Sequence, residues 1–374
     1  MTESKTTTTL IPWWRPETGH EEREMVLRVL ESNYLNDGDV TTDFERGMAA
    51  ALGARYGVAV TSGTAAIFLA LVGAGVQHGD EVIVPDVTFI ATANAVTLAG
   101  ASPVFVDIDP TTLTLDPEAF ARVITPRTKA VVPVHVSGRA AAIDRILEIA
   151  NARGVVVIED AAEALRSRHR GRCLGTFGLA GCFSFSPNKT ITTGQGGLIV
   201  TDDEALVVRL RELKDQGRPV RGTGGNDVHS SIGFNFKLTN LQAAVGIAQL
   251  ARLDARIDRL VAMYREYRRG LAGVGQVQVL PFDVDHGESP QWVDVLADDR
   301  DRLMAHLHRH DIQCRPFWFP IHTQQPYRRP DTEFPNALRL VGKALWLPSA
   351  LSLSDEDVRF VCERICEFYQ VKNT

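Results

Sequence analysis

Residues 182–200 of the chain, CFSFSPNKTITTGQGGLIV, place a single lysine, Lys189, in a polar loop between two short apolar runs. The runs CFSF and GGLIV are typical of buried strands, so the loop is expected at the end of a sheet. A lysine amine is costly to bury, and it becomes a nucleophile when its surroundings lower its pKa. An amine at the end of the strands of a sheet can form a Schiff base with an aldehyde cofactor, although most lysines are simply exposed to solvent.

The composition is that of an ordinary soluble globular protein. The chain has 374 residues, 44% of them hydrophobic and 23% charged, which suits two domains or one large α/β unit with an appendage. Its net charge of −6 provides no basic excess for nucleic-acid binding. The five cysteines form no CxxC pair, so neither a metal site nor a disulfide framework is expected. We expect no signal peptide and no membrane span, and the cytoplasm is the simplest compartment.

Short apolar runs alternate with helical segments through the first half of the chain. The runs lie at 58–61, 81–85, 103–106, 130–134 and 155–158. Such alternation predicts βαβ units in a mostly parallel sheet that is buried on both faces. Ligands of these sheets bind beyond the carboxyl ends of the strands. The residues that follow each run are therefore the candidates for a site.

The chain is expected to divide into three parts. Residues 1–12 read as a disordered tail, 13–250 as a large domain and 251–374 as a smaller α+β domain. A strong helix that begins after Thr239 is expected to continue without interruption into the second domain. The glycine-rich polar stretch 215–231 is a long loop, and such loops are usually functional or mobile.

Three strand ends carry residues that suit a ligand. Gly63 and Thr64 open a helix after the first run, where free N–H groups can hold a phosphate or an ordinary N-cap can form. Phe89, after the second run, can stack on a flat ring or join the core. Asp160, after the fifth run, is expensive to bury alone. It can hold a protonated pyridine nitrogen or cap the next helix.

Taken together, these features resemble the DegT/DnrJ/EryC1/StrS family of sugar aminotransferases, which depend on pyridoxal phosphate. The resemblance runs from about Glu21 to Phe368. It rests on SGTAAIFLAL, DEVIVPDVTFIATANAV, GASPVFVDIDP, ITPRTKAVVPVHVSG, VIEDAAEAL, GTFGLAGCFSFSPNKTITTGQGG and GFNFKLTNLQAAVGIAQL. It implies the aspartate-aminotransferase fold (fold type I), with a large domain around a mostly parallel sheet and a smaller α+β domain. The cofactor would alternate between pyridoxal phosphate and pyridoxamine phosphate.

The resemblance also implies a role for each residue around the cofactor ring. Lys189 would form the Schiff base and move protons, and Asp160 would pair with the pyridine nitrogen. Phe89 would stack on the ring, and Glu163 would lie near its O3′ side.

A second group is implied to hold the cofactor phosphate. Gly63 and Thr64 would do so through the helix N-terminus, joined by the hydroxyl of Ser184. Asn235 would reach the phosphate of the neighbouring subunit's cofactor, which makes the active unit a homodimer with shared sites.

Within the family, NKTITTGQGG and IQCRPFWFPIHTQQPY resemble perosamine-synthase-type enzymes, which aminate C4 of GDP-4-keto-6-deoxymannose. We therefore expect transfer of an amino group from L-glutamate to the keto group of a nucleotide-linked deoxysugar, for an antibiotic or a surface glycan. Lys237, Arg315 and His322 are the candidates for contacts to the substrate diphosphate.

Some positions depart from the family pattern. Gln195 stands where glutamate is usual, Lys237 where arginine is usual, and Asp86 where a small residue is common. A 3-keto sugar, a larger antibiotic sugar such as a GDP-octose, or a keto-cyclitol remain alternative acceptors. Two other functions are disfavoured. Related dehydratases carry histidine in place of the lysine, and a non-catalytic pyridoxal-phosphate-binding regulator is expected to lose Lys189 or Asp160, which are both present here.

Overall fold

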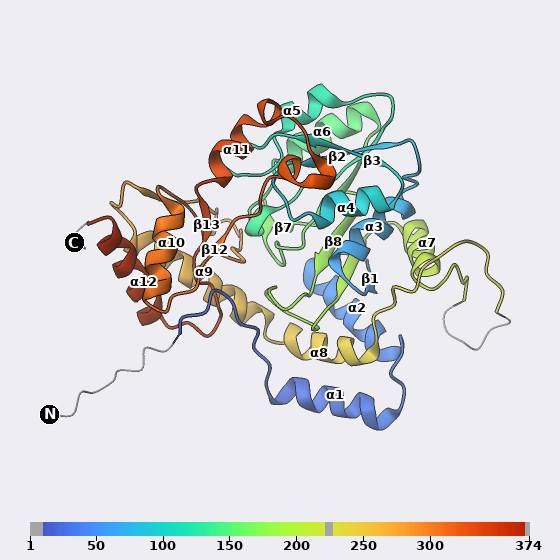
Figure 1. Cartoon of the computed structure of the whole chain (residues 1–374). Coiled ribbons are helices and arrows are strands. Elements are labelled where there is room, and N and C mark those ends of the chain that lie inside the picture. The colour runs from blue at the N-terminus through green and yellow to red at the C-terminus, as the bar shows by residue number, and fades with distance from the viewer. Residues whose placement is uncertain (1–9, 221–226, 371–374) are drawn as a thin grey trace.

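The computed structural model describes residues 10–220 and 227–370 (Figure 1). Its largest element is a seven-stranded sheet in the order β1-β9-β8-β5-β4-β2-β3. All neighbours run parallel except β9, which is antiparallel to both β1 and β8. The prediction of a mostly parallel sheet is therefore confirmed. The strands are β1 (Tyr56–Val60), β2 (Glu81–Pro85), β3 (Ser102–Val106), β4 (Thr128–Val131), β5 (Val156–Asp160), β8 (Ala180–Ser184) and β9 (Gly197–Thr201).

Helices cover both faces of this sheet, which is why its strands read as continuous apolar runs. Alternate residues of one strand enter opposite cores. Val82 and Val84 of β2 pack with α3, α4 and α7, while Ile83 packs with α5 and α6. All three side chains are fully buried. These helices are α3 (Gly63–Gly73), α4 (Ala91–Leu98), α5 (Pro117–Val123), α6 (Ile143–Arg153) and α7 (Glu204–Lys214).

The helix expected to run on from Thr239 is two helices, so that prediction was wrong. Helix α8 (Asn240–Leu250) begins with the predicted capping box, in which Thr239 and Gln242 bond each other's backbone N–H groups. It packs on α1 (His20–Ser32) and α2 (Asp39–Leu52), whereas α9 (Leu253–Gly270) packs on α12 (Asp355–Phe368). One straight helix cannot serve both partners. The chain turns at Arg252, whose side chain pairs with Glu22 of α1. Neither α9 nor any other described helix combines the length and apolar character that a membrane crossing needs.

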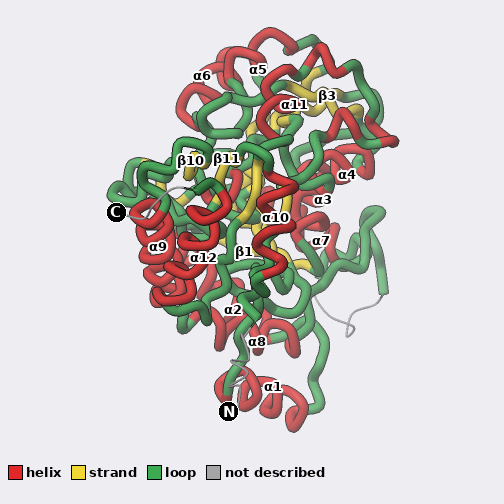
Figure 2. Tube along the Cα trace, turned by 60° about the vertical axis from the view of Figure 1, so that its left-hand side comes forward, coloured by secondary structure: helices red, strands yellow, loops and turns green. Residues whose placement is uncertain are grey.

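A smaller antiparallel sheet forms the centre of the C-terminal part, in the order β10-β11-β13-β12. Helices α9 and α12 lie side by side on it, as Figure 2 shows, and α10 packs against α12. Helix α11 instead reaches back to the large sheet, where Asp107 accepts the backbone N–H groups of Asn336 and Ala337. The expected division at residue 250 stays a prediction. The bounds are β10 (Val277–Val279), β11 (Asp294–Ala297), β12 (Arg315–Pro316), β13 (Ala344–Trp346), α10 (Arg300–Arg309) and α11 (Pro335–Val341).

The remaining short elements connect these layers. They are the hairpin β6 (Arg168–His169) and β7 (Arg172–Cys173), and the 3₁₀ turns η1 (Val136–Gly138), η2 (Ile321–Thr323), η3 (Gln325–Tyr327) and η4 (Asp331–Glu333).

The N-terminal segment is packed from an earlier residue than expected. Of the predicted tail 1–12, residues 1–9 lie outside the described part of the chain. Ile11, however, is buried and forms a β-bridge with Ile312 beside the small sheet. Trp13 then packs against Trp292 and Trp346, with ring centroids 5.3 and 6.1 Å away.

A buried ion pair joins the two sheets. Arg139 follows η1, at the carboxyl end of the large sheet, and donates to Asp294 of β11 at 2.8 Å. It also donates to the backbone oxygens of Thr112 and Pro281 and lies over the Phe282 ring. Burial raises the pKa of Asp294, against the effect of Arg139. Arg139 thus allows a carboxylate to be buried at this junction.

We expect Arg139→Ala to destabilise the protein by about 3–5 kcal/mol, because it leaves Asp294 buried without its counter-charge. Urea unfolding measures this change. The double variant Arg139→Met with Asp294→Leu should recover most of the loss, since it removes both charges. Arg145→Ala, at an exposed pair with Glu118, is the control and should unfold like the parent. Equal midpoints for Arg139→Ala and the control would contradict the assignment.

Candidate active site

A cavity of about 290 Å³ opens at the carboxyl end of the large sheet. It brings together eight of the eleven residues that the sequence singled out: Gly63, Thr64, Phe89, Asp160, Glu163, Ser184, Lys189 and Arg315. Three are not among its lining residues: Asn235, Lys237 and His322. The site therefore assembles from segments spread over more than half of the chain.

The Lys189 loop folds back on the end of β8. Backbone bonds from Lys189 N–H to the Ser186 oxygen and from Thr193 N–H to the Phe185 oxygen close its turns. The indole N–H of Trp14 donates to the Pro187 oxygen at 2.9 Å, so the N-terminal segment also holds the loop. These contacts fix the lysine at the cavity wall.

The amine of Lys189 meets a carboxylate that the sequence analysis had not paired with it. Its Nζ lies 3.2 Å from Oε1 of Glu163 and 4.9 Å from the centroid of the Trp292 ring. The lysine side chain is only 11% exposed and that of Glu163 only 5%. Burial raises the pKa of Glu163, and Lys189 and the Ser137 N–H act against that rise. The pair holds the amine inside the cavity.

Asp160 ends β5 and points into the same cavity. Its Oδ2 accepts from the Thr92 hydroxyl at 2.7 Å and its Oδ1 from the Ala162 N–H at 3.1 Å. Both donors are neutral. Burial raises the pKa of Asp160, with these hydrogen bonds and the charge of Lys189 opposing it. A cation placed against this carboxylate would stabilise its ionised form.

The start of α3 supplies an anion-binding end. Ser62 is the N-cap, and its Oγ accepts from the Ala65 N–H at 3.1 Å. The first N–H groups of a helix, here those of Gly63 and Thr64, have no acceptor within the helix and attract anions. A Cβ on Gly63 would lie 2.8 Å from the Cβ of Ser184, so only glycine allows these two segments to approach. The sequence did not favour capping or anion binding at this helix start. The two roles are compatible, because they use different N–H groups.

Aromatic residues form the outer part of the cavity. Phe89 is 53% exposed, unlike a core phenylalanine. Trp292, Trp318 and Arg315 close the wall from the smaller sheet's side. Arg315 lies 5.0 Å from the Trp13 ring centroid. An adjoining hollow shares Thr88, Phe89, Arg315 and Trp318 with the cavity and continues along residues 316–319, 321 and 324.

His322, expected to contact substrate, is fully buried and is not among the residues that line the cavity. Its Nδ1 lies 2.6 Å from Asp86 Oδ2, its backbone N–H donates to Asp86 Oδ1, and its ring stacks on Phe334. Burial raises the pKa of Asp86, and the contacts with His322 lower it. This pairing also explains why an acid is tolerated at position 86.

Lys237 is engaged within its own chain as well. Its Nζ donates to Asp215 at 2.5 Å and to Oδ1 of Asn235 at 2.9 Å. Asp215 and Asn235 are joined by a β-bridge at the start of the 215–231 loop. The described parts of that loop extend away from the body of the molecule beside α7 (Figure 1). Residues 221–226 lie outside the described chain.

Two residues of the site were missed from the sequence: Thr92, which donates to Asp160, and Trp292, which lines the cavity. Thr92 lies in the first turn of α4, three residues after Phe89, and a threonine so close to a candidate stacking residue was a usable signal. Trp292 had none, because it comes from a loop before β11 and meets Lys189 only through the fold.

These features fit pyridoxal phosphate. One cavity holds an amine, a buried carboxylate whose hydrogen-bond donors are neutral, and a helix N-terminus whose close approach requires glycine. An aldehyde, a basic ring nitrogen and a phosphate are the matching groups of that cofactor.

Comparison with known proteins agrees with this fit. Residues 16–366 match the DegT/DnrJ/EryC1/StrS aminotransferase family. GDP-perosamine synthase of Escherichia coli O157:H7 is 39% identical over 97% of this chain and 99% of its own length. S. venezuelae DesV, solved with a ketimine intermediate, superposes with a TM-score of 0.89 at 34% identity, covering 94% of this chain and 95% of its own. DesI, solved in the presence of its TDP-sugar product, gives a TM-score of 0.88 at 34% identity, covering 96% and 93%. The chain therefore belongs to the DegT/DnrJ/EryC1/StrS aminotransferase family and is a pyridoxal-phosphate-dependent sugar aminotransferase.

Proposed function

We propose that this enzyme moves an amino group from L-glutamate to the C4 keto group of a nucleotide-linked deoxysugar. The observation that carries the proposal is the amine of Lys189 in a cavity that continues into an aromatic hollow bordered by Arg315. The inner cavity suits a single-ring cofactor, and the hollow offers a flat apolar surface and a cation beside it. The relatives named for GDP-perosamine and for a TDP-sugar product support this class of acceptor.

Lys189 is the residue that holds the cofactor covalently and transfers protons. Pyridoxal phosphate, when bound, supplies an electron sink that acidifies the C–H bond beside the transferred nitrogen. The Lys189 amine, once free, is positioned to take that proton and return it on the acceptor side. Glu163, 3.2 Å away, keeps the amine directed into the cavity. Asp160, held by Thr92, would pair with the ring nitrogen of the bound cofactor and stabilise its protonated form.

The start of α3 and the end of β8 would hold the cofactor phosphate. Gly63 and Thr64 present backbone N–H groups, and Ser184 presents its hydroxyl, which already lies beside Gly63. Phe89 is exposed at the cavity wall and is available to stack on the ring. Holding both ends of the cofactor fixes the reacting carbon relative to Lys189.

Among the three candidates for substrate contacts, Arg315 is retained. It lines both the cavity and the hollow, and a guanidinium can bind a diphosphate through two parallel hydrogen bonds. Lys237 and His322 are each committed to a carboxylate of this chain, so neither is assigned to the diphosphate here.

The active unit is proposed to be a homodimer with shared sites. Asn235 lies outside the cavity of its own chain, at the base of a loop that extends from the body (Figure 1). Leu27 and Leu30 of α1 and the following Tyr34 and Leu35 are exposed large apolar side chains. A second copy of the chain would cover such residues and bring its own Asn235 to the cofactor phosphate.

Lys189→Ala should abolish covalent attachment of the cofactor and lower turnover by about 10²–10⁴-fold or more, because the proton-transferring amine is lost. Borohydride reduction followed by mass measurement detects the covalent cofactor, and an amino-sugar assay gives turnover. Lys343→Ala, an exposed lysine of the smaller unit, is the control and should match the parent. Unchanged turnover in Lys189→Ala would refute the assigned role.

Mixing inactive variants tests the shared site. Asn235→Ala should weaken cofactor retention, and when it is mixed and re-equilibrated with Lys189→Ala, activity should return. Half of random dimers are mixed, and each has one intact site, so about one quarter of all sites recover. If Asn235 instead acted within its own chain, each subunit of a mixed dimer would carry one damaged site, and mixing would restore no activity. A fully active monomer would likewise exclude sharing.

A half-reaction panel tests the acceptor. L-glutamate should bleach the visible absorbance of the lysine-bound cofactor, and a correct acceptor should restore it. GDP-, dTDP- and UDP-linked 4-keto and 3-keto sugars and a keto-cyclitol are added one at a time. Recovery with a nucleotide-linked 4-keto sugar supports the proposal, whereas recovery only with the cyclitol or a 3-keto sugar overturns the acceptor. Failure of glutamate to bleach the absorbance overturns the donor.

A further inference from the structure

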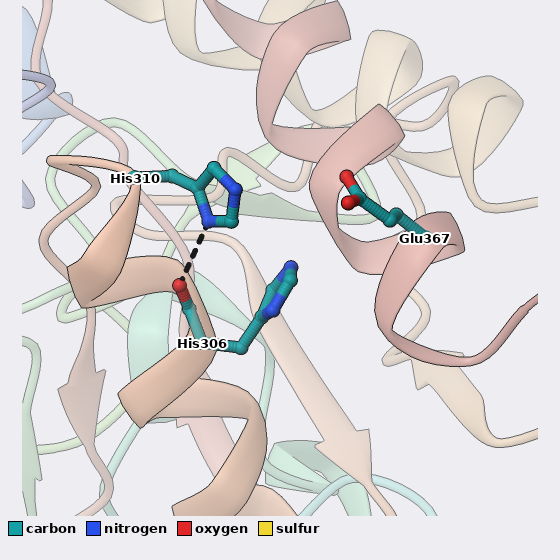
Figure 3. A group of neighbouring side chains, drawn as sticks. All are labelled: His306, His310 and Glu367. Atoms are coloured by element: carbon teal, nitrogen blue, oxygen red, sulfur yellow. Dashed lines mark hydrogen bonds between the residues drawn. The ribbon is translucent and has the colours of Figure 1, made fainter.

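A second group of metal-binding side chains lies on the smaller unit (Figure 3). His306 and His310 occupy the last turn and the C-cap of α10, and Glu367 projects from the facing helix α12. One donor atom from each of the three lies within 4.8 Å of the others. No residue of α10 or α12 lines the cavity around Lys189. This group therefore belongs to no feature of the aminotransferase site.

The spacing and the hydrogen bonds of the two histidines suit a shared ion. Residues four apart on a helix lie on one face, and paired histidines at this spacing form known helical zinc sites. Nδ1 of His310 lies 3.0 Å from the His306 backbone oxygen, to which it donates (Figure 3). That bond orients the ring and leaves Nε2 as the coordinating nitrogen, as in zinc-binding histidines whose other nitrogen bonds a carbonyl.

His306 adds an independent observation. Its Nε2 is buried and has no hydrogen-bond partner among the described residues. A buried nitrogen without a partner is destabilising, and an ion at this point would satisfy it.

The carboxylate of Glu367 supplies the negative charge. The side chain is half-exposed, and its Oε2 pairs with Arg364 at 2.6 Å, so the other oxygen is the one to reach an ion. A tetrahedral zinc ion holds nitrogen and oxygen donors about 3.3 Å apart. The donors must therefore draw together by about 1–1.5 Å, which the exposed Glu367 and the helix-terminal His310 can accommodate.

We propose that His306, His310 and Glu367 form a zinc site that ties the C-terminal end of α10 to α12, with water in the fourth position. Two imidazoles and one carboxylate favour Zn²⁺ over Mg²⁺, which prefers oxygen ligands. The expectation of no metal site rested on the cysteine pattern, which does not take histidines into account. The site is structural, since it lies apart from the cavity.

The test is zinc binding by the tag-free, full-length holoenzyme. Calorimetric titration with Zn²⁺ should show one ion per chain and thermal unfolding should shift upward, while Mg²⁺ should do neither. Co²⁺ in place of Zn²⁺ should give the visible spectrum of a histidine-bound ion. Amino-transfer turnover should not change, which separates this proposal from the catalytic one.

Variants locate the ion. His310→Ala and Glu367→Gln should each lose the binding event, the thermal shift and the cobalt spectrum while keeping parental turnover, which shows that they fold. His308→Ala, an exposed histidine on the same helix outside the group, should behave like the parent. Absence of zinc binding by the parent, or equal binding by His310→Ala and the parent, would overturn the proposal.

Discussion

The ion pair between Lys189 and Glu163 is the interaction around which the site is arranged. Buried charges cost more in lost hydration than their attraction returns unless each is also hydrogen-bonded. The fold meets this requirement by directing the Ser137 N–H at Glu163. Asp160 adds a second buried carboxylate, and burial raises the pKa of both. Two carboxylates thus face one amine, and a protonated ring nitrogen would balance them, which is a physical reason for this cavity to favour pyridoxal phosphate.

Ser137 connects that ion pair to the smaller unit. Its backbone N–H holds Glu163, its oxygen accepts from the Gln291 N–H, and its Oγ accepts from the Trp346 indole. It adopts a φ of 55°, which is uncommon for a residue other than glycine and is maintained by these contacts. The neighbouring Arg139 makes the buried ion pair to β11 two residues later. The contacts of Ser137 and Arg139 therefore hold the two sheets together and also position Glu163, the partner of Lys189.

The features that the sequence predicted correctly depend on short-range patterns. Runs such as EVIVP read as buried strands because both faces of β2 are covered by helices. The Thr239 capping box was visible because its two partners are three residues apart. The break before α9 was not visible, since it accompanies the packing of α8 on α1 and α2 and of α9 on α12, which lie far away in the sequence. A propensity pattern contains no information about where a helix finds its packing partner.

The sequence by itself determined the fold class, and it predicted the residues of the inner site, because Lys189, Asp160 and the start of α3 each lie at a strand end that local patterning reveals. Only the tertiary structure decided which charges are available to a ligand. His322 meets Asp86 across 236 positions of the chain, and Lys237 meets Asp215, so both candidates contact carboxylates that no local motif indicates. The same holds for the position of Trp292 over Lys189 and for the approach of Glu367 to the α10 histidines. A side chain's chemistry is set by its own residue type, but its availability is set by neighbours that only folding brings together.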